Sequence, residues 1–279
     1  RKLNEPSIAH SSAESHGDMF MEFILGKSID NSTDLRSIPV SSFYYQHRLK
    51  GEDPYHWLPI QDGWVFKKST QETFSSGEAH NVLYVTGFNA DEGTTLFPLY
   101  YSGGPLNSDW IKQVWEMSDF SYLSLPKKLR EYVKLNGLSP FRAAVDLYGD
   151  LSFGADVFFM ISQFVKNGGK GYLYVFDQKS GVRQQTLGST HALELFYLFG
   201  RPIPFWPWDK QDQYVSAMML KDWTDIAKTG KPRDQWLPFN PLQPKAMHYG
   251  TPTKYKGIEK LALYQFLETI YLQEGVRFN

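Results

Sequence analysis

The chain contains no cysteine among its 279 residues. This absence excludes disulfide bonds, metal sites built on thiolates and a cysteine nucleophile. It does not fix the cellular compartment, because a secreted protein can also lack disulfides. Any nucleophile within these 279 residues is therefore a residue of another type.

Long apolar runs and clusters of basic residues are also missing. No stretch of 18 apolar residues occurs, so the sequence predicts no transmembrane helix. The 29 lysines and arginines are balanced by 30 aspartates and glutamates, for a net charge of −1, and no run of five or six basic residues stands out. Nucleic acid is therefore not an expected partner.

The first six residues lack both an initiator methionine and the apolar core of a signal peptide. The expectation is an internal start: a processed, cleaved or incompletely displayed product. One N-glycosylation sequon, Asn31-Ser32-Thr33, is compatible with secretion, although single sequons often arise by chance. The compartment stays open, with a secreted or periplasmic location favoured over a cytoplasmic one.

The chain does have a hydrophobic content of 42%, enough to bury a substantial core. Two β-rich apolar runs predict strands at 82–88 and 171–176, and residues 61–66 predict a turn followed by a short strand. Helical spacing and stop signals predict helices at 9–26, 108–117, 126–136, 140–147, 152–167, 210–228 and 257–274, with a short helical piece beginning at 35–40.

Strands that alternate with helices predict an α/β architecture with a partly parallel sheet. Two or three strands are too few for a sheet that must be covered on both faces. The small number of strands therefore predicts that part of the fold is missing from this sequence.

Two polar residues follow the predicted strands. Glu92 lies in a glycine turn directly after the strand at 82–88, and His191 lies in the loop after the strand at 171–176. A carboxylate at the end of a strand can orient a histidine and stabilise its protonated form, although Asn-x-Asp-Glu-Gly is also ordinary turn sequence. Asp91 is expected to be a turn or helix-cap residue. The order acid, then histidine, is that of α/β-hydrolases, but no Gly-x-Ser-x-Gly occurs in the chain.

Two other assignments are weaker. His191 and Glu194 have the i, i+3 spacing of some helical metal sites, but no second ligand set accompanies them. Ala13-Glu14-Ser15-His16-Gly17 imitates a nucleophile turn, but the polar residues before it cannot form the buried strand that such a turn needs. Ser15 is therefore interpreted as surface at the start of a helix.

Several motifs, in order along the chain, resemble the type-B carboxylesterase/cholinesterase family. They are Leu-Arg-Ser-Ile-Pro at 35–39, Pro-Ile-Gln-Asp-Gly at 59–63, Asn-Ala-Asp-Glu-Gly-Thr at 89–94, Gly-Asp-x-x-Phe at 149–153, Gly-Lys-Gly-Tyr-Leu-Tyr-Val-Phe at 169–176, His-Ala-Leu-Glu at 191–194 and Trp-x-x-Ile-Ala-Lys-Thr-Gly-Lys-Pro at 223–232. The sequence departs from the family at Ala192, where glycine is usual, and at Thr95 and Leu96, where members that hydrolyse choline esters carry aromatic residues.

The resemblance implies an α/β-hydrolase fold in which residues 1–279 form the C-terminal portion of a single catalytic domain. It implies that Glu92 and His191 complete a Ser-His-Glu triad, and that the N-terminal strands and nucleophile elbow lie outside this chain. The serine would come from an N-terminal segment of the same gene product. The implied reaction is hydrolysis of a small carboxylic ester without cofactor or metal.

The expected substrate is a general aliphatic or aromatic ester, because the aromatic residues that would bind a quaternary ammonium are not present. Leu96, Phe97 and Leu193 are candidate pocket residues, with plain core packing as the alternative. A second hypothesis for the whole protein is a non-catalytic adhesion or binding relative, since the family includes members that keep the fold and lose the triad. Retention of both Glu92 and His191 argues against it.

Overall fold

The computed structural model describes residues 13–26, 35–45, 59–79, 82–100, 140–179, 187–203 and 206–274. The chain divides into two compact units, Arg1–Thr70 and Gln71–Asn279. The expected helices at 108–117 and 126–136 lie outside the described residues.

The first unit contains short helices. Helix α1 spans Ala13–Leu25, the 3₁₀ helix η1 spans Leu35–Ser37, and α2 spans Val40–Tyr45. Helix α1 ends where the sequence predicted, because Gly26 takes a φ of 65° and its N–H donates to the Glu22 carbonyl at 2.8 Å. Ser15 is an exposed residue near the start of this helix, as expected.

The short strand predicted within 61–66 is wrong. The Asp62 carboxylate accepts hydrogen bonds from the backbone N–H groups of Trp64, Val65 and Phe66 at 2.9–3.0 Å. These local bonds hold the segment in a turn, in competition with an extended ladder. The three apolar side chains that suggested a strand are exposed.

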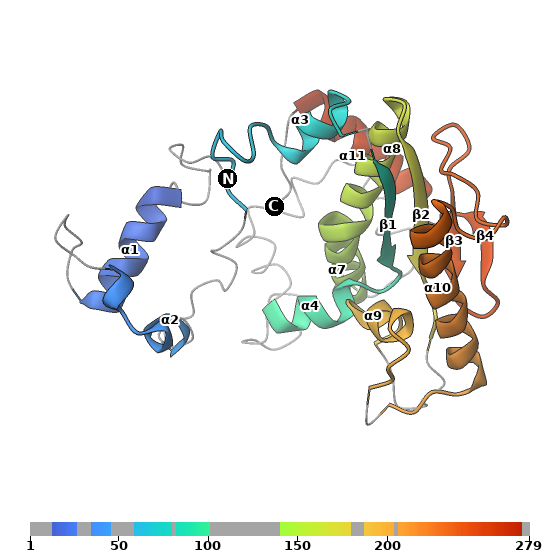
Figure 1. Ribbon diagram of the computed structural model, residues 1–279, viewed down its shortest axis with the longest axis horizontal. Coiled ribbons are helices and arrows are strands. Elements are labelled where there is room, and N and C mark those ends of the chain that lie inside the picture. The colour runs from blue at the N-terminus through green and yellow to red at the C-terminus, as the bar shows by residue number, and fades with distance from the viewer. Residues whose placement is uncertain are drawn as a thin grey trace. The chain divides into compact units, whose positions relative to one another are not determined.

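The second unit is built on a four-stranded sheet in the order β1-β2-β3-β4, visible in Figure 1. Strands β1 (Leu83–Asn89), β2 (Lys170–Phe176) and β3 (Lys245–Tyr249) are parallel, and β4 (Lys254–Gly257) returns antiparallel to β3. The first two strands match the sequence prediction. Strands β3 and β4 were missed because they are short and carry charged or polar residues instead of an apolar run.

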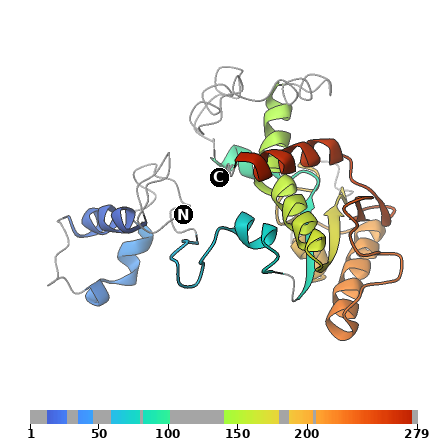
Figure 2. The ribbon, with the colours of Figure 1, turned by 90° about the horizontal axis from the view of Figure 1, so that it is seen from above.

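Helices cover both faces of this sheet (Figures 1 and 2). Side chains of β2 alternate between two cores, as the two-residue period of a strand requires. Leu173 and Val175 pack in one cluster with residues of α8 (Ala155–Lys166) and α11 (Leu261–Glu274). Tyr172 and Phe176 pack in the other cluster with residues of α9 (Leu193–Leu198) and α10 (Lys210–Thr229). The predicted α/β layering is therefore present.

Helix α3 (Thr70–Ser75) begins at the last residue of the first unit and continues into the second, which also contains α4 (Gly93–Tyr100), α7 (Pro140–Gly149) and the π-helix η2 (Asp150–Gly154). Helix α10 ends at Thr229 and is capped by Gly230, the predicted stop signal, which has a φ of 72°. The last helix begins at Leu261 instead of residue 257, because β4 continues to Gly257 and a turn follows it.

Candidate active site

The parallel pairing of β1 and β2 brings the loops after these strands to one edge of the sheet. The two strands end in register, with Asn89 opposite Phe176. A single parallel bridge then joins Asp91 to Thr190, one residue before Glu92 and one before His191. Backbone geometry therefore delivers the acid and the histidine to the same place.

Glu92 and His191 are hydrogen-bonded. The Nδ1 atom of His191 lies 2.6 Å from Oε2 of Glu92, the contact that the sequence predicted. The other carboxylate oxygen, Oε1, accepts the Asn89 backbone N–H at 2.8 Å. With 7% of its surface exposed, Glu92 is fixed by a bond at each oxygen. A carboxylate held in this way orients the imidazole and fixes its tautomer.

His191 is the more accessible partner, with 37% of its side chain exposed. The hydrogen bond and charge of Glu92 raise the pKa of His191 above its ordinary value, against the opposing effect of burial. The ring also packs on Phe153 of η2, with centroids 4.8 Å apart. Because π-helical turns recur at functional sites, the position of η2 beside the histidine is consistent with a site at this edge.

A second carboxylate, that of Glu194, is linked to the Glu92–His191 pair through Asn89. The Asn89 side-chain amide donates to the Thr190 carbonyl at 2.7 Å and also to Glu194 Oε2. Burial raises the pKa of Glu194, and the bond from Asn89 opposes that effect. Asn89 therefore ties the strand that precedes Glu92 to the residues on both sides of His191. The sequence predicted no separate role for Asn89, although its place as the last residue of a strand was a usable signal.

The loops of this site are pinned to each other. Asp91 accepts the Ser189 backbone N–H at Oδ2, 2.9 Å away, and the Asp91 N–H donates to the Ser189 carbonyl at 3.1 Å. The Thr94 hydroxyl is hydrogen-bonded to Thr190 Oγ1 at 2.9 Å. Asp91 is thus a turn residue that joins the two loops, as the sequence predicted, and not the partner of the histidine.

Two backbone positions are unusually constrained. A Cβ atom on Gly93 would lie 1.9 Å from the Val145 carbonyl oxygen, so α4 can start directly after Glu92 only with glycine there. Ala192, which follows the histidine, takes the left-handed conformation with a φ of 62°. Glycine, usual in the family at this position, adopts that conformation without strain.

The candidate pocket residues do not share one environment. Leu193 is 4% exposed and packs in the core cluster on the α9–α10 face, which agrees with the core-packing alternative. Leu96 is half-buried on α4. The side chain of Phe97 lies outside the described residues. Among the described residues, no three His, Cys, Asp or Glu side chains gather where they could hold a metal ion.

A second histidine–carboxylate pair was not predicted. Nδ1 of His248, in β3, lies 2.8 Å from Oδ2 of Asp177, the residue directly after β2. Asp177 directly follows β2, just as the loop with Glu92 directly follows β1. Its position after a predicted strand could therefore have marked it as a candidate acid. His248 had no such signal, because β3 was not recognised.

The fold and this site define a class of protein. Parallel strands, helices on both faces, and an acid and a histidine from successive loops at one sheet edge are features of the α/β-hydrolases. Comparison with known proteins agrees: the sequence model described as "Carboxylesterase family" matches residues 32–267. The chain belongs to the carboxylesterase family, as its sequence predicted, and has the α/β-hydrolase fold.

Curated relatives include mammalian carboxylesterases. Carboxylesterase 1C of Mus musculus is 25% identical over 196 residues, which cover 64% of this chain and 35% of the mouse protein. Liver carboxylesterase of Sus scrofa is 24% identical over 242 residues, covering 80% of this chain and 42% of the pig protein. Carboxylesterase 1D of Rattus norvegicus is 27% identical over 210 residues, covering 68% and 36%. The chain thus spans about two fifths or less of the relatives it matches. Within the described residues, no helix has the length and apolar character needed to cross a bilayer.

Proposed function

We propose that the full-length protein is a serine carboxylic-ester hydrolase in which Glu92 and His191 serve as two members of a Ser-His-Glu triad. The observation that carries this proposal is the 2.6 Å contact between Glu92 Oε2 and His191 Nδ1. In the neutral ring the Nδ1 proton is donated to Glu92, so Nε2 holds the lone pair that a general base needs.

The chemistry proceeds in two halves. The serine oxygen attacks the ester carbonyl while Nε2 of His191 takes the hydroxyl proton. The imidazolium then gives that proton to the departing alcohol, which leaves an acyl-serine. Water attacks the acyl group by the same route, and the acid product departs. Glu92 stabilises the imidazolium in both halves and remains ionised. No metal or organic cofactor is required.

The serine is proposed to come from an N-terminal segment of the same gene product. Among the described strands, β1 is the outermost strand of the sheet and pairs with β2 alone. Further strands could therefore pair with the lateral edge of β1 that faces away from β2. The relatives extend well beyond the part that this chain matches. An interface across this edge should be large and apolar, above the roughly 2,000 Å² where obligate contacts begin.

Residues 1–279 are proposed to form the C-terminal portion of one catalytic domain. The family match at 32–267 crosses the boundary at Thr70 between the two compact units. A match that continues through the boundary supports the proposal of one domain.

The proposed substrate is a small aliphatic or aromatic ester. Leu96 and Phe97 lie on α4, which begins one residue after Glu92, so they are the proposed side chains for the acyl pocket. Leu193 is retained as a lower-ranked candidate because of its burial. If Leu96 contacts the acyl group, Leu96→Trp should shift the preference toward shorter acyl chains in a series of p-nitrophenyl esters.

The direct test is covalent trapping in the full-length protein. A fluorophosphonate probe should label one serine upstream of these residues and abolish hydrolysis of p-nitrophenyl butyrate. Labelling should be slowed by several orders of magnitude in His191→Ala, whereas Lys221→Ala, on the exposed surface of α10, should label at the original rate. A folded protein that neither hydrolyses esters nor reacts with the probe would reject the esterase and favour a non-catalytic binding protein.

A further inference from the structure

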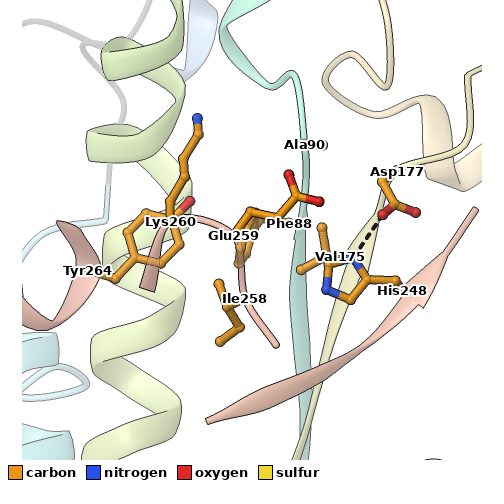
Figure 3. A pocket seen from close by; sticks show the side chains of 9 residues that line it. All are labelled: Phe88, Ala90, Val175, Asp177, His248, Ile258, Glu259, Lys260 and Tyr264. Atoms are coloured by element: carbon orange, nitrogen blue, oxygen red, sulfur yellow. Dashed lines mark hydrogen bonds and ion pairs between the residues drawn. The ribbon is translucent and has the colours of Figure 1, made fainter. Parts of the chain in front are cut away.

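The second histidine–carboxylate pair borders a pocket. The pocket contains about 370 Å³ of empty space, including the part open to solvent, and lies between the ends of β1, β2 and β3 and the turn that leads into α11. Figure 3 shows the side chains that line it. Its apolar walls come from Phe88, Val175, Ile258 and Tyr264, and its polar side comes from His248 and Asp177.

One nitrogen of His248 is left without a partner. His248 is 2% exposed, and its Nδ1 is bonded to Asp177. Its Nε2 is buried and has no hydrogen-bond partner among the described residues. In Figure 3 this nitrogen points away from Asp177, toward the space among the lining side chains. A buried polar atom without a partner costs about 1–3 kcal/mol, so the pocket favours an occupant that satisfies it.

The other charged groups at the pocket already have partners. Lys260 Nζ lies 2.8 Å from both carboxylate oxygens of Asp150. Glu259 is 79% exposed at the rim and is paired with Lys256 at 3.1 Å. These pairs leave His248 Nε2 as the polar atom that an occupant would meet within the apolar walls.

We propose that this pocket binds a small alcohol or phenol, whose hydroxyl group donates to His248 Nε2 and whose apolar part packs against Phe88, Val175, Ile258 and Tyr264. Because Nδ1 faces a carboxylate, the neutral ring carries its proton on Nδ1 and accepts at Nε2. A ligand that binds this neutral form of the ring is therefore a hydrogen-bond donor. A lone water on Nε2 would leave the apolar walls uncovered, whereas the apolar part of a larger alcohol or phenol would cover them.

The site is separate from the proposed triad. Its histidine is on β3 and its acid directly follows β2, whereas His191 and Glu92 lie on the loops that the Asp91–Thr190 bridge joins. Binding here therefore needs neither the nucleophilic serine nor ester hydrolysis.

The test compares phenol with anisole, which keeps the ring and the oxygen but cannot donate. Both are titrated by calorimetry into the full-length protein and into His248→Leu. The preference for phenol over anisole should fall about tenfold in His248→Leu, since the variant removes the acceptor and keeps an apolar wall. His191→Ala should keep the original preference. The proposal would be overturned if His248→Leu preferred phenol over anisole as strongly as the unmodified protein does. It would also be overturned if the unmodified protein preferred anisole and His248→Leu lost that preference.

A second variant covers the case in which His248→Leu does not fold. Ile258→Trp leaves the Asp177–His248 pair in place and fills the pocket, so it should abolish binding of both ligands. A crystal soaked in 4-bromophenol should show the bromine signal among the apolar walls and the phenol oxygen within about 3 Å of Nε2. A water alone on Nε2, with no bromine in the pocket, would refute the site, as would binding that Ile258→Trp leaves intact.

Discussion

Two histidine–carboxylate pairs lie at the carboxyl ends of the parallel strands of one sheet. They share the same two side-chain types, but they differ in the elements that carry them and in the exposure of the histidine. His191 and Glu92 belong to loops, and 37% of the histidine side chain is exposed. His248 belongs to a strand, its acid follows the neighbouring strand, and only 3% of its side chain is exposed. Both histidines use Nδ1 for the carboxylate, so the difference lies in what Nε2 can reach.

The comparison shows that the same histidine–carboxylate contact occurs in two different settings. The loop position of His191 leaves its ring open to a group from another part of the protein. The strand position of His248 encloses its ring between core side chains and a small pocket. Substitutions at each pair can test whether this difference in setting separates a reactive pair from a binding pair.

The largest expected effect separates the two histidines by activity. His191→Ala should lower kcat/KM for an ester in the full-length protein by about 10⁴ to 10⁶, because triad members act as a unit. His248→Ala should lower activity per folded molecule by less than about tenfold. It should instead reduce the free energy of unfolding by about 2–4 kcal/mol, since it opens a cavity beside a partly buried carboxylate. Comparable activity losses in His191→Ala and His248→Ala would contradict the assignment of the catalytic role to His191 alone.

The next effect concerns the acid of the first pair. Glu92→Gln should lower kcat by up to about 10⁴, since the imidazolium loses its counter-charge. The Glu92 hydrogen bond raises the pKa of His191, so under the proposed mechanism the protein loses its base as the pH falls through that raised pKa. Without the carboxylate the pKa falls, and the acidic limb of the pH–activity profile should move to lower pH.

The control for this profile is Asp225→Asn, which removes a carboxylate paired with Lys221 on the surface of α10. Its acidic limb should coincide with that of the unmodified protein. If the limb moved to higher pH in Glu92→Gln, the electrostatic role assigned to Glu92 would be wrong.

A glycine beside each pair gives a matched test of rigidity. A Cβ on Gly93 would lie 1.9 Å from the Val145 carbonyl oxygen, whereas a Cβ on Gly250 would lie 2.3 Å from the Asp177 carboxylate oxygen. A backbone carbonyl can move aside for the added methyl group less easily than the end of a side chain can. Gly93→Ala should therefore cost about 3 kcal/mol or more in the free energy of unfolding, and Gly250→Ala about 1 kcal/mol. Urea denaturation measures both, and the reverse ranking would contradict the packing argument.

The smallest effect lies next to His191. Ala192 holds a left-handed conformation that costs an alanine about 1–2 kcal/mol, while glycine loses roughly 0.5–1 kcal/mol in backbone entropy on folding. Ala192→Gly should therefore stabilise the protein by up to about 1 kcal/mol. Ala227→Gly, at an exposed helical position of α10, should destabilise it by about the same amount. Equal losses of thermal stability in both variants would show that Ala192 is not strained.

The sequence predicted the parts of the fold with strong local signals. The strands near 82–88 and 171–176 have long β-rich runs, and the helix near 210–228 has a clear glycine end; all three are present. The strand expected within 61–66 did not form, because Asp62 binds the backbone of the next residues. Strands β3 and β4 escaped notice because their burial depends on neighbours and not on their own hydrophobicity.

The candidate site was predictable to a similar degree. The order of Glu92 and His191 along the chain, each after a strand, follows from local sequence, and their contact follows from parallel pairing. The roles of Asn89 and Glu194 could not be read in the same way, because each depends on a partner about a hundred residues away. The pocket at His248 depends on a strand that the sequence did not reveal.

The sequence by itself determined where strands β1 and β2 end and which polar residues follow them, since both features are local. Only the tertiary structure decided which of the seven histidines meets which carboxylate, because that choice depends on strand order and register. It also decided what each histidine can reach. His191, on a loop, keeps 37% of its side chain exposed, whereas His248, on a strand of a sheet that has helices on both faces, keeps 3%.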